Sequence, residues 1–265
     1  MTVIVPTLNS ARTLKGAIES VVGQSYPFVE TVLVDGGSDD ATLTIAHGYP
    51  VEVAEGHWRR GAARLEGARR ANGRYLLFLD SDQLLSKEIV AECVALCRDR
   101  GRSAVIIPEV SVGSGMWVQY HSLEKQLTSS TSGTGYPRFF ERSVYFEIGG
   151  HSPEFDDFME DRSIFLRFEG AGYRAATASN PITNDLGHFN LLEFGAKNAR
   201  STRDADQFYR ANRDDSPFRV TLERARNLLD GIRRFGRDPT HLLLFATYLF
   251  VGYGPRLVLA AVGYF

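Results

Sequence analysis

The sequence of 265 residues contains little cysteine and no uninterrupted apolar run long enough to span a membrane, which needs about 20 residues. Its two cysteines, Cys93 and Cys97, lie four residues apart. A zinc site would need two more ligands at suitable spacing, so we expect small buried thiols in a reducing compartment. The formal net charge is −2, which gives no reason to expect nucleic acid as a partner. No signal-like leader precedes the first apolar segment, and we expect the main domain on the cytoplasmic side.

Two common nucleotide-binding motifs are also missing. The first apolar segment is followed neither by G-x-x-x-x-G-K-[ST] nor by G-x-G-x-x-G, so neither a P-loop nor a dinucleotide-binding fold is favoured. Strands and helices nevertheless alternate, which predicts an α/β fold with a mostly parallel sheet flanked by helices and with right-handed crossovers. The expected strands are 2–6, 30–34, 51–54 and 75–79, and the expected helices include 11–23, capped by Asn9 or Ser10, and 61–72.

The run Tyr75–Leu79 is wholly apolar and is followed by Asp80-Ser81-Asp82. Such a run is typical of a parallel strand buried on both faces, and ligands of α/β sheets bind at the carboxyl ends of the strands. If residues 80–82 stay extended, both carboxylates face one spot, where a divalent cation would offset their repulsion. The alternative is that Asp82 caps a helix beginning near Ser86 and Asp80 is a solvated loop acid.

Glycine and arginine mark two further candidate segments. Asp35-Gly36-Gly37 follows the second strand, where glycine lets backbone N–H groups approach a nucleotide and Asp35 could accept from a base or ribose hydroxyl. Arg60 and Arg64 lie four apart near the start of a helix, on one face, and could meet a diphosphate. The alternatives are a plain turn with a capping aspartate and a solvated helix face.

Taken together and in order, these motifs resemble the family 2 glycosyltransferases of the GT-A fold. The resemblance rests on 3–9, 34–42 and 61–82, and it extends to about residue 190. It departs at Gly36, where many relatives have a second acid. It implies a Rossmann-like GT-A catalytic domain over residues 1–190, with a nucleotide-sugar half to about 110 and an acceptor half over 111–190.

The resemblance also assigns the donor and metal sites. It implies a UDP- or GDP-sugar donor and a Mn²⁺ or Mg²⁺ ion held by Asp80, Asp82 and His188, although a lone histidine is more often a surface or packed residue. The donor-binding residues that it implies are Pro6, Thr7, Leu8, Asn9, Asp35, Gly37, Arg60, Gly61, Arg64, Asp80 and Ser81.

The segment 158–167 is similar to the acceptor side of the same family and contains its Glu-Asp pair at the start of a helix. Inverting transfer needs a carboxylate that takes the proton of the acceptor hydroxyl. The resemblance makes Asp161 that base, with Glu160 holding the acceptor or orienting Arg162. Arg138 and Arg162 are the candidate acceptor contacts. The alternative for the pair is the preference of a helix N-terminus for negative charge.

The family pattern thins after residue 190. Residues 191–240 are expected to form Arg-rich amphipathic helices, and 241–265 is an almost charge-free tail interrupted at 252–256. This combination indicates a segment that lies in the membrane interface or re-enters it. The alternative is a helical pair packed on the protein's own core or on a second subunit, and a homo-oligomer is left open. Membrane contact would favour an acceptor on a lipid carrier, such as polyprenyl or dolichyl phosphate, or a lipid-linked glycan.

Two other function classes remain open. A sugar-nucleotide nucleotidyltransferase would carry a glycine-rich loop with a basic residue after the first strand, where this chain has Pro6–Ser10. A catalytically silent binding protein at the membrane would tolerate loss of the acids, and the presence of Asp80, Asp82 and Asp161 argues against it. The segment 113–135, rich in Ser, Thr and Gly, is expected to be either a mobile segment near the acceptor or a loop without function.

Overall fold

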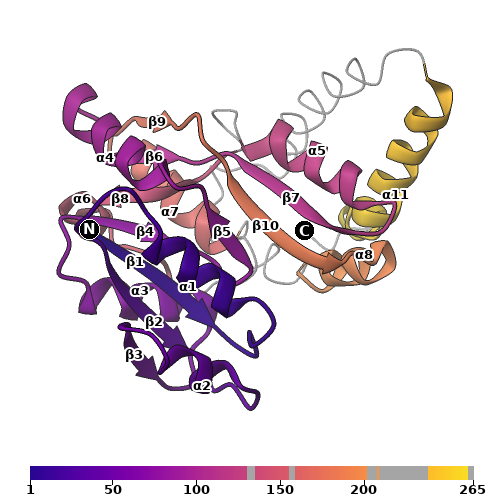
Figure 1. Cartoon of the computed structure of the whole chain (residues 1–265). Coiled ribbons are helices and arrows are strands. Elements are labelled where there is room, and N and C mark those ends of the chain that lie inside the picture. Colours follow the sequence, from indigo (N-terminus) through magenta and orange to yellow (C-terminus); the bar gives the residue numbers. More distant parts are fainter. Residues whose placement is uncertain (130–134, 155–158, 202–207, 209–237, 262–265) are drawn as a thin grey trace. The chain divides into compact units, whose positions relative to one another are not determined.

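The computed structural model describes residues 1–129, 135–154, 159–201, 208 and 238–261, drawn in colour in Figure 1. The chain divides into two compact units. The first comprises Met1–Pro108 and Tyr136–Asp185, and the second comprises Glu109–Gly135 and Leu186–Phe265. Residues 109–135 therefore group with the C-terminal part of the chain. The sequence-based expectation instead includes them in a catalytic domain over residues 1–190.

Among the described residues of the first unit, seven strands form one sheet in the order β3-β2-β1-β4-β8-β6-β9. Neighbours pair in parallel except that β8 runs antiparallel to both β4 and β6. The predicted α/β fold with a mostly parallel sheet is confirmed. The strands are β1 (Thr2–Thr7), β2 (Glu30–Asp35), β3 (Glu52–Glu55), β4 (Tyr75–Phe78), β6 (Ala104–Ile106), β8 (Pro137–Glu141) and β9 (Ala175–Thr177).

Helices cover both faces of this sheet, and the alternation of strand side chains supplies a core to each. Val3 and Leu77 point into one core, and Ile4 and Phe78 into the other. The first core is closed by α1 (Leu14–Val22) and α4 (Ile89–Arg100), which carries the buried, unbridged Cys93 and Cys97 as predicted. The second core is closed by α3 (Arg60–Arg70), α6 (Arg142–Glu147) and α7 (Met159–Gly170). The short α2 (Thr42–Ala46) follows β2.

The chain turns sharply after β4. The N–H of Gln83 donates to the carbonyl oxygen of Asp80 at 3.0 Å, so residues 80–83 form a turn. The expectation that residues 80–82 stay extended is wrong. The alternative of a cap at Asp82 is also wrong, because β5 (Gln83–Leu85) comes next and α4 begins only after Glu88. β5 pairs antiparallel with the first residues of β10 (Ile182–His188).

The start of α1 also differs from the expectation. The helix begins at Leu14, and no side chain caps it. The carbonyl oxygen of Ser10 instead accepts from the N–H groups of Thr13 and Leu14, so a turn precedes the helix. The side chains of Asn9 and Ser10 are engaged by neighbouring loops, which explains why neither serves as the predicted cap.

The second unit contains β7 (Glu109–Ser114), α5 (Val118–Ser129), α8 (Leu191–Arg200) and α11 (Pro239–Ala261). Residues 118–129 of the segment expected to be a loop are therefore helical, because Tyr120 and its neighbours bury an aromatic face against α11. The first part of the predicted amphipathic region is α8, and most of 202–237 lies outside the described residues.

The predicted break at 252–256 is wrong, since α11 continues through it. Gly252 does not end the helix but lets it approach α8 closely: a Cβ atom there would lie 2.8 Å from the ring of Phe194. Phe245 and Tyr248 of α11 are buried in the same contact region. Within the described ranges, no helix combines the length and the apolarity that crossing a membrane requires.

Candidate active site

Asp35 ends β2 and shapes the loop that follows it. The residue is 1% exposed. One carboxylate oxygen accepts from Thr7 Oγ1 at 3.0 Å and Ser38 Oγ at 2.6 Å, and the other from the N–H groups of Gly37 and Ser38. Burial acts to raise the pKa of Asp35, but these hydrogen bonds, led by that of Ser38, bring it below its usual value. Asp35 is thus an ionised acceptor that organises the loop, and its contact with a donor stays a prediction.

The loops after β1, β2 and β4 are hydrogen-bonded to one another. The N–H of Asn9, a residue with a φ of 50°, donates to Ser38 Oγ at 2.8 Å, and its side-chain oxygen accepts from the N–H of Asp39 at 3.0 Å. The hydroxyls of Ser10 and Ser81 lie 2.7 Å apart. Three predicted donor-binding segments therefore meet at one edge of the sheet, as expected for the carboxyl ends of neighbouring parallel strands.

Arg64 joins the acid after β4 to the Glu-Asp pair at the start of α7. Its Nη1 donates to Asp161 Oδ1 at 2.6 Å and to Glu160 Oε1 at 3.2 Å, and its Nη2 donates to Asp80 Oδ1 at 2.8 Å. The side chain is 1% exposed. The buried face of α3 is otherwise built from glycine and alanine, so the helix lies close to the sheet and only Arg64 extends from it. These four residues are called the Arg64 cluster below.

Three carboxylates share Arg64, and Glu160 is the most deeply buried of them. Glu160 is 0% exposed, and its Oε2 atom has no hydrogen-bond partner among the described residues. Desolvation and the charge of Asp161 raise the pKa of Glu160 to about 7. Burial also acts to raise the pKa of Asp80 and of Asp161. The positive charge of Arg64 outweighs this effect and holds each pKa well below its usual range. Near neutral pH the cluster therefore contains two ionised aspartates and a glutamate that readily holds a proton.

Both oxygens of Asp80 are engaged by arginine. Oδ1 accepts from Arg64, and Oδ2 accepts from Arg138 Nη1 at 3.3 Å. Arg138, a predicted acceptor contact on β8, thus lies beside the acid at the end of β4. A cation that used Asp80 as a ligand would share this carboxylate with the two guanidinium groups.

The predicted metal ligands are divided between the two units. Asp82 is exposed in the turn after β4. His188 is the last residue of β10 and belongs to the second unit, where its Nδ1 lies 3.2 Å from Ser114 Oγ. Across the described part of the chain, no group of three or more His, Cys, Asp or Glu side chains suits a metal ion. The exposed carboxylate of Asp82 fits a hard cation that takes its remaining ligands from phosphate and water.

The other predicted arginines lie in different surroundings. Arg60 is exposed at the first position of α3, and Gly61 after it is buried. Arg162 is 2% exposed, with its guanidinium 5.8 Å from the centre of the Phe165 ring. Its burial among the residues of α7 makes it a packed cation, and its contact with an acceptor stays a prediction.

His151, which lies in the loop between α6 and α7, is a site residue that no sequence motif predicts. The residue is 1% exposed, and its Nε2 lies 3.4 Å from Asp161 Oδ1. Its Nδ1 lies 3.0 Å from the hydroxyl of Tyr145. The available signal was a single histidine after Gly149-Gly150, a few residues before the Glu-Asp pair.

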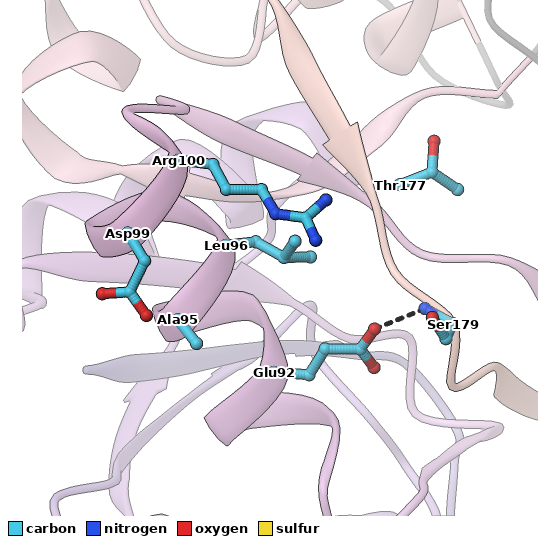
Figure 2. Close-up of a pocket in the computed structure, with 7 residues that line it drawn as sticks. All are labelled: Glu92, Ala95, Leu96, Asp99, Arg100, Thr177 and Ser179. Atoms are coloured by element: carbon cyan, nitrogen blue, oxygen red, sulfur yellow. Dashed lines mark hydrogen bonds between the residues drawn. The ribbon is translucent and has the colours of Figure 1, made fainter.

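A hollow of about 310 Å³ lies beside α4, lined by Glu92, Ala95, Leu96, Asp99, Arg100, Thr177 and Ser179 (Figure 2). A carboxylate oxygen of Glu92 accepts from the N–H of Ser179 at 2.5 Å, so the acid serves to hold this loop. None of the lining residues belongs to the Arg64 cluster. The hollow is therefore separate from the candidate active site.

Comparison with known proteins places these features in one family. The sequence profile described as Glycosyl transferase family 2 matches residues 2–163, more than half of the chain. The chain therefore belongs to glycosyl transferase family 2. The match covers the loops after β1, β2 and β4 and ends just after the Glu-Asp pair.

Similar proteins carry the corresponding names. A PGL/p-HBAD biosynthesis glycosyltransferase of Mycobacterium bovis is 32% identical over 120 residues, which is 42% of this chain and 47% of the relative. The matched stretches span between 14% and 47% of the length of such curated relatives, less than half in each case.

Solved structures share the fold. The mannosyltransferase PcManGT from Pyrobaculum calidifontis, in complex with GDP-Man and Mn²⁺, is 23% identical with a TM-score of 0.59, covering 97% of this chain and 81% of that one. Residues 1–349 of TarS from Staphylococcus aureus, in complex with UDP-GlcNAc, are 17% identical with a TM-score of 0.59, covering 96% and 80%. The likeness establishes a GT-A type of α/β fold for this chain.

Proposed function

We propose that the chain is an inverting glycosyltransferase that moves a sugar from a nucleotide-diphosphate sugar to an acceptor hydroxyl or phosphate. The observation that carries the proposal is the Arg64 cluster. It keeps Asp161 ionised, as a general base must be, and links it through one guanidinium to Asp80 at the edge of the sheet where α/β folds bind ligands.

The donor would be a UDP- or GDP-sugar bound by the joined loops after β1, β2 and β4. Their mutual hydrogen bonds give a preformed surface of polar backbone groups beside the arginines of α3. Two structural neighbours were solved with UDP-GlcNAc and with GDP-Man, which supports these nucleotide classes. The predicted donor contacts remain Pro6, Thr7, Leu8, Asn9, Asp35, Gly37, Arg60, Gly61, Arg64, Asp80 and Ser81.

Asp161 would act as the base. The acceptor oxygen forms a bond to the anomeric carbon from the face opposite the leaving group, and its proton passes to Asp161. The bond between the anomeric carbon and the diphosphate oxygen breaks, and the nucleoside diphosphate leaves with the electron pair. Glu160, with its raised pKa, is partly protonated at neutral pH and so opposes the ionisation of Asp161 less than a fully charged carboxylate would.

A Mn²⁺ or Mg²⁺ ion would be held by Asp82, with Asp80 and His188 as the further predicted ligands. When bound, such an ion offsets the negative charge of the leaving diphosphate. The complex of PcManGT with Mn²⁺ supports this part of the proposal. If Asp80 binds the ion, Arg138, which contacts Asp80 at 3.3 Å, would share that carboxylate with the ion.

The acceptor would be a lipid-linked glycan or carrier phosphate, met at the cytoplasmic face of a membrane by Arg138 and Arg162. Helix α11 offers the support for membrane contact. While Phe245 and Tyr248 are buried, Leu243 and Phe250 are 69% and 76% exposed and lie two helical turns apart on another face. Exposed apolar side chains of this kind insert into the interfacial layer of a bilayer.

The test is calorimetric titration of the purified chain with UDP, GDP and CDP, each with and without Mn²⁺. We expect one nucleotide to bind selectively and only with the metal. We expect Asp82→Ala to weaken the metal-dependent binding, whereas Asp99→Ala, which changes an exposed acid on α4, should behave as the wild type. Failure of all three nucleotides to bind would contradict the proposal.

A further inference from the structure

His151 is a buried imidazole held next to the candidate base. Its ring lies 4.6 Å from the ring of Phe78 in an edge-on contact, and its Nε2 faces Asp161 Oδ1 at 3.4 Å. The Nε2 atom is buried and has no hydrogen-bond partner within the described residues, so its contact with Asp161 Oδ1 lies in ion-pair range without hydrogen-bond geometry. A small shift of the Asp161 carboxylate would supply the missing acceptor.

The hydrogen bonds of Tyr145 determine which ring nitrogen carries the proton. The Tyr145 hydroxyl oxygen accepts from the backbone N–H of His151 at 3.0 Å and lies 3.0 Å from His151 Nδ1. If the hydroxyl donates to Nδ1, both of its hydrogen-bonding capacities are used, and Nε2–H points at the carboxylate. In the other tautomer the buried hydroxyl has no acceptor among the described residues, and the Nε2 lone pair faces a negative charge. The Nε2–H tautomer is therefore strongly preferred.

The loop that carries His151 is fixed on its other side. Arg167 on α7 donates to the carbonyl oxygens of Ile148 and Gly150, both at 2.6 Å. The imidazole is thus held by its contacts with the Tyr145 hydroxyl and by the bonds that Arg167 makes to the backbone before it. The Phe78 ring packs against the imidazole. Side chains locked in this way can orient a reacting group with little freedom.

We propose that His151 is a positioning residue for Asp161, with its Nε2–H aimed at Oδ1 so that Oδ2 is the oxygen that receives the acceptor's proton. Arg64 also donates to Oδ1, and among the described residues no hydrogen bond reaches Oδ2. The two donors therefore set the plane of the carboxylate and leave one oxygen for the acceptor. This inference rests on the proposed function of Asp161 as the base.

The charges around the imidazole favour a neutral ring. Desolvation lowers the pKa of His151 to about 4, although Asp161 acts in the opposite direction. Arg64 and Arg167 add to the lowering. The groups that face Asp161 are Arg64 from α3, Arg138 from β8, His151 and its neighbour Glu160. The ring remains uncharged through the neutral range and contributes an N–H, so its effect on Asp161 is orientation more than charge.

Kinetics of three variants test the role. We expect His151→Phe, which keeps an aromatic ring against Phe78, to lower kcat by about 10- to 100-fold with little change in donor KM. His151→Gln, whose amide can replace Nε2–H, should recover part of the lost kcat. The kcat of Tyr145→Phe should lie between those of His151→Phe and His151→Gln. The probes are UDP-GlcNAc and GDP-mannose with polyprenyl phosphate as acceptor. His47→Gln, an exposed histidine, is the control.

The pH profile separates positioning from folding. The interaction with His151 contributes to the lowered pKa of Asp161, so the acid limb of kcat/KM should move to higher pH in His151→Phe and partly return in His151→Gln. Wild-type kcat and an unmoved profile in His151→Phe would overturn the role of His151 alone. Full activity of Asp161→Asn would instead overturn the proposed base, and the role of His151 with it.

The tautomer can be measured without activity. Long-range ¹H–¹⁵N correlation of the full chain labelled in histidine, assigned by comparison with His151→Phe, should show a neutral Nε2–H ring from pH 6 to 8. Tyr145→Phe should shift the Nδ1 resonance. A Nδ1–H tautomer in the wild type, or a ring that titrates near its ordinary pKa of 6.5, would overturn the proposal.

Discussion

Replacing Arg64 by methionine should be among the most damaging single changes in the first unit. Methionine has an unbranched side chain of similar volume and no charge, so the change removes the guanidinium and keeps the packing of the stem. It leaves the buried Glu160 and the half-buried Asp80 and Asp161 without their shared donor, at side-chain exposures of 0%, 23% and 14%. Arg138 and Arg60 also act on these carboxylates, but of the two only Arg138 has a described ion pair with one of them, to Asp80 at 3.3 Å.

The expected magnitude follows from the cost of leaving buried charge unpaired. Removing one partner of a buried ion pair costs about 3 to 5 kcal/mol of unfolding free energy. In a unit of this size each kcal/mol lowers Tm by about 2 to 4 °C, so the transition should fall by roughly 6 to 20 °C. The matched control on the same helix is Arg70→Met. Its side chain is 41% exposed and pairs with Glu52 and Glu66 at the surface, so it should cost less than about 1 kcal/mol.

The pH dependence gives the prediction a sign. In the wild type the pKa values of Asp80 and Asp161 lie below their usual range, so their stabilisation is present above about pH 4 and is lost on acidification. Without Arg64 the same carboxyls are only desolvated, and their pKa values rise. The Arg64→Met variant is then most stable near pH 4 and loses stability as pH rises. The difference between the wild type and Arg64→Met should therefore be largest near pH 8.

Thermal and urea unfolding of both variants at pH 4.5, 6 and 8, followed by circular dichroism, would measure this difference. A difference that grows towards acid pH would refute the reasoning. So would an Arg64→Met protein as stable at pH 8 as Arg70→Met.

Two further predictions concern Glu160 and the surface of α11. Glu160→Gln mimics the protonated carboxyl. Because the pKa of Glu160 is raised from 4.5 to about 7, the stability that the protonated Glu160 gives the wild type is lost as pH rises through 7. The variant should therefore be more stable than the wild type at pH 9 by up to about 3 kcal/mol. Equal pH profiles of unfolding would contradict this. In sedimentation with vesicles of anionic phospholipid, Leu243→Ser/Phe250→Ser should bind less than the wild type, whereas Val22→Ser/Phe28→Ser, which alters exposed apolar residues of the first unit, should bind equally. Equal loss in both pairs would contradict a membrane face on α11.

The sequence predicted the first unit well because its strands have simple signals. Short apolar runs ending in Asp35 and Asp80, with glycine or acid after them, occur where the chain leaves a buried parallel sheet, and the structure has strands there. The Glu-Asp pair lies at the start of α7 as expected. These features depend on local composition, which a single sequence records directly.

Other features depend on contacts between distant residues and could not be predicted in this way. Arg64 was expected to meet a diphosphate, but its three carboxylate partners come from elements far along the chain. Gly252 was interpreted as a helix breaker, whereas its role is to let α11 approach Phe194 on α8. His151 had no motif of its own, and only the position of Tyr145 and Asp161 around it gives it a role.

The most direct test of the account is the effect of Asp161→Asn on transfer and on donor binding measured in parallel. Asparagine keeps the shape of the side chain and removes its ability to take a proton. We expect the rate of sugar transfer from the bound donor to fall by at least about 100-fold. The calorimetric affinity for the same nucleotide with Mn²⁺ should stay within a factor of about three, which is a change in binding free energy below about 1 kcal/mol. Transfer at the wild-type rate, or an equal loss of donor binding and rate, would contradict the assignment of Asp161 as the base.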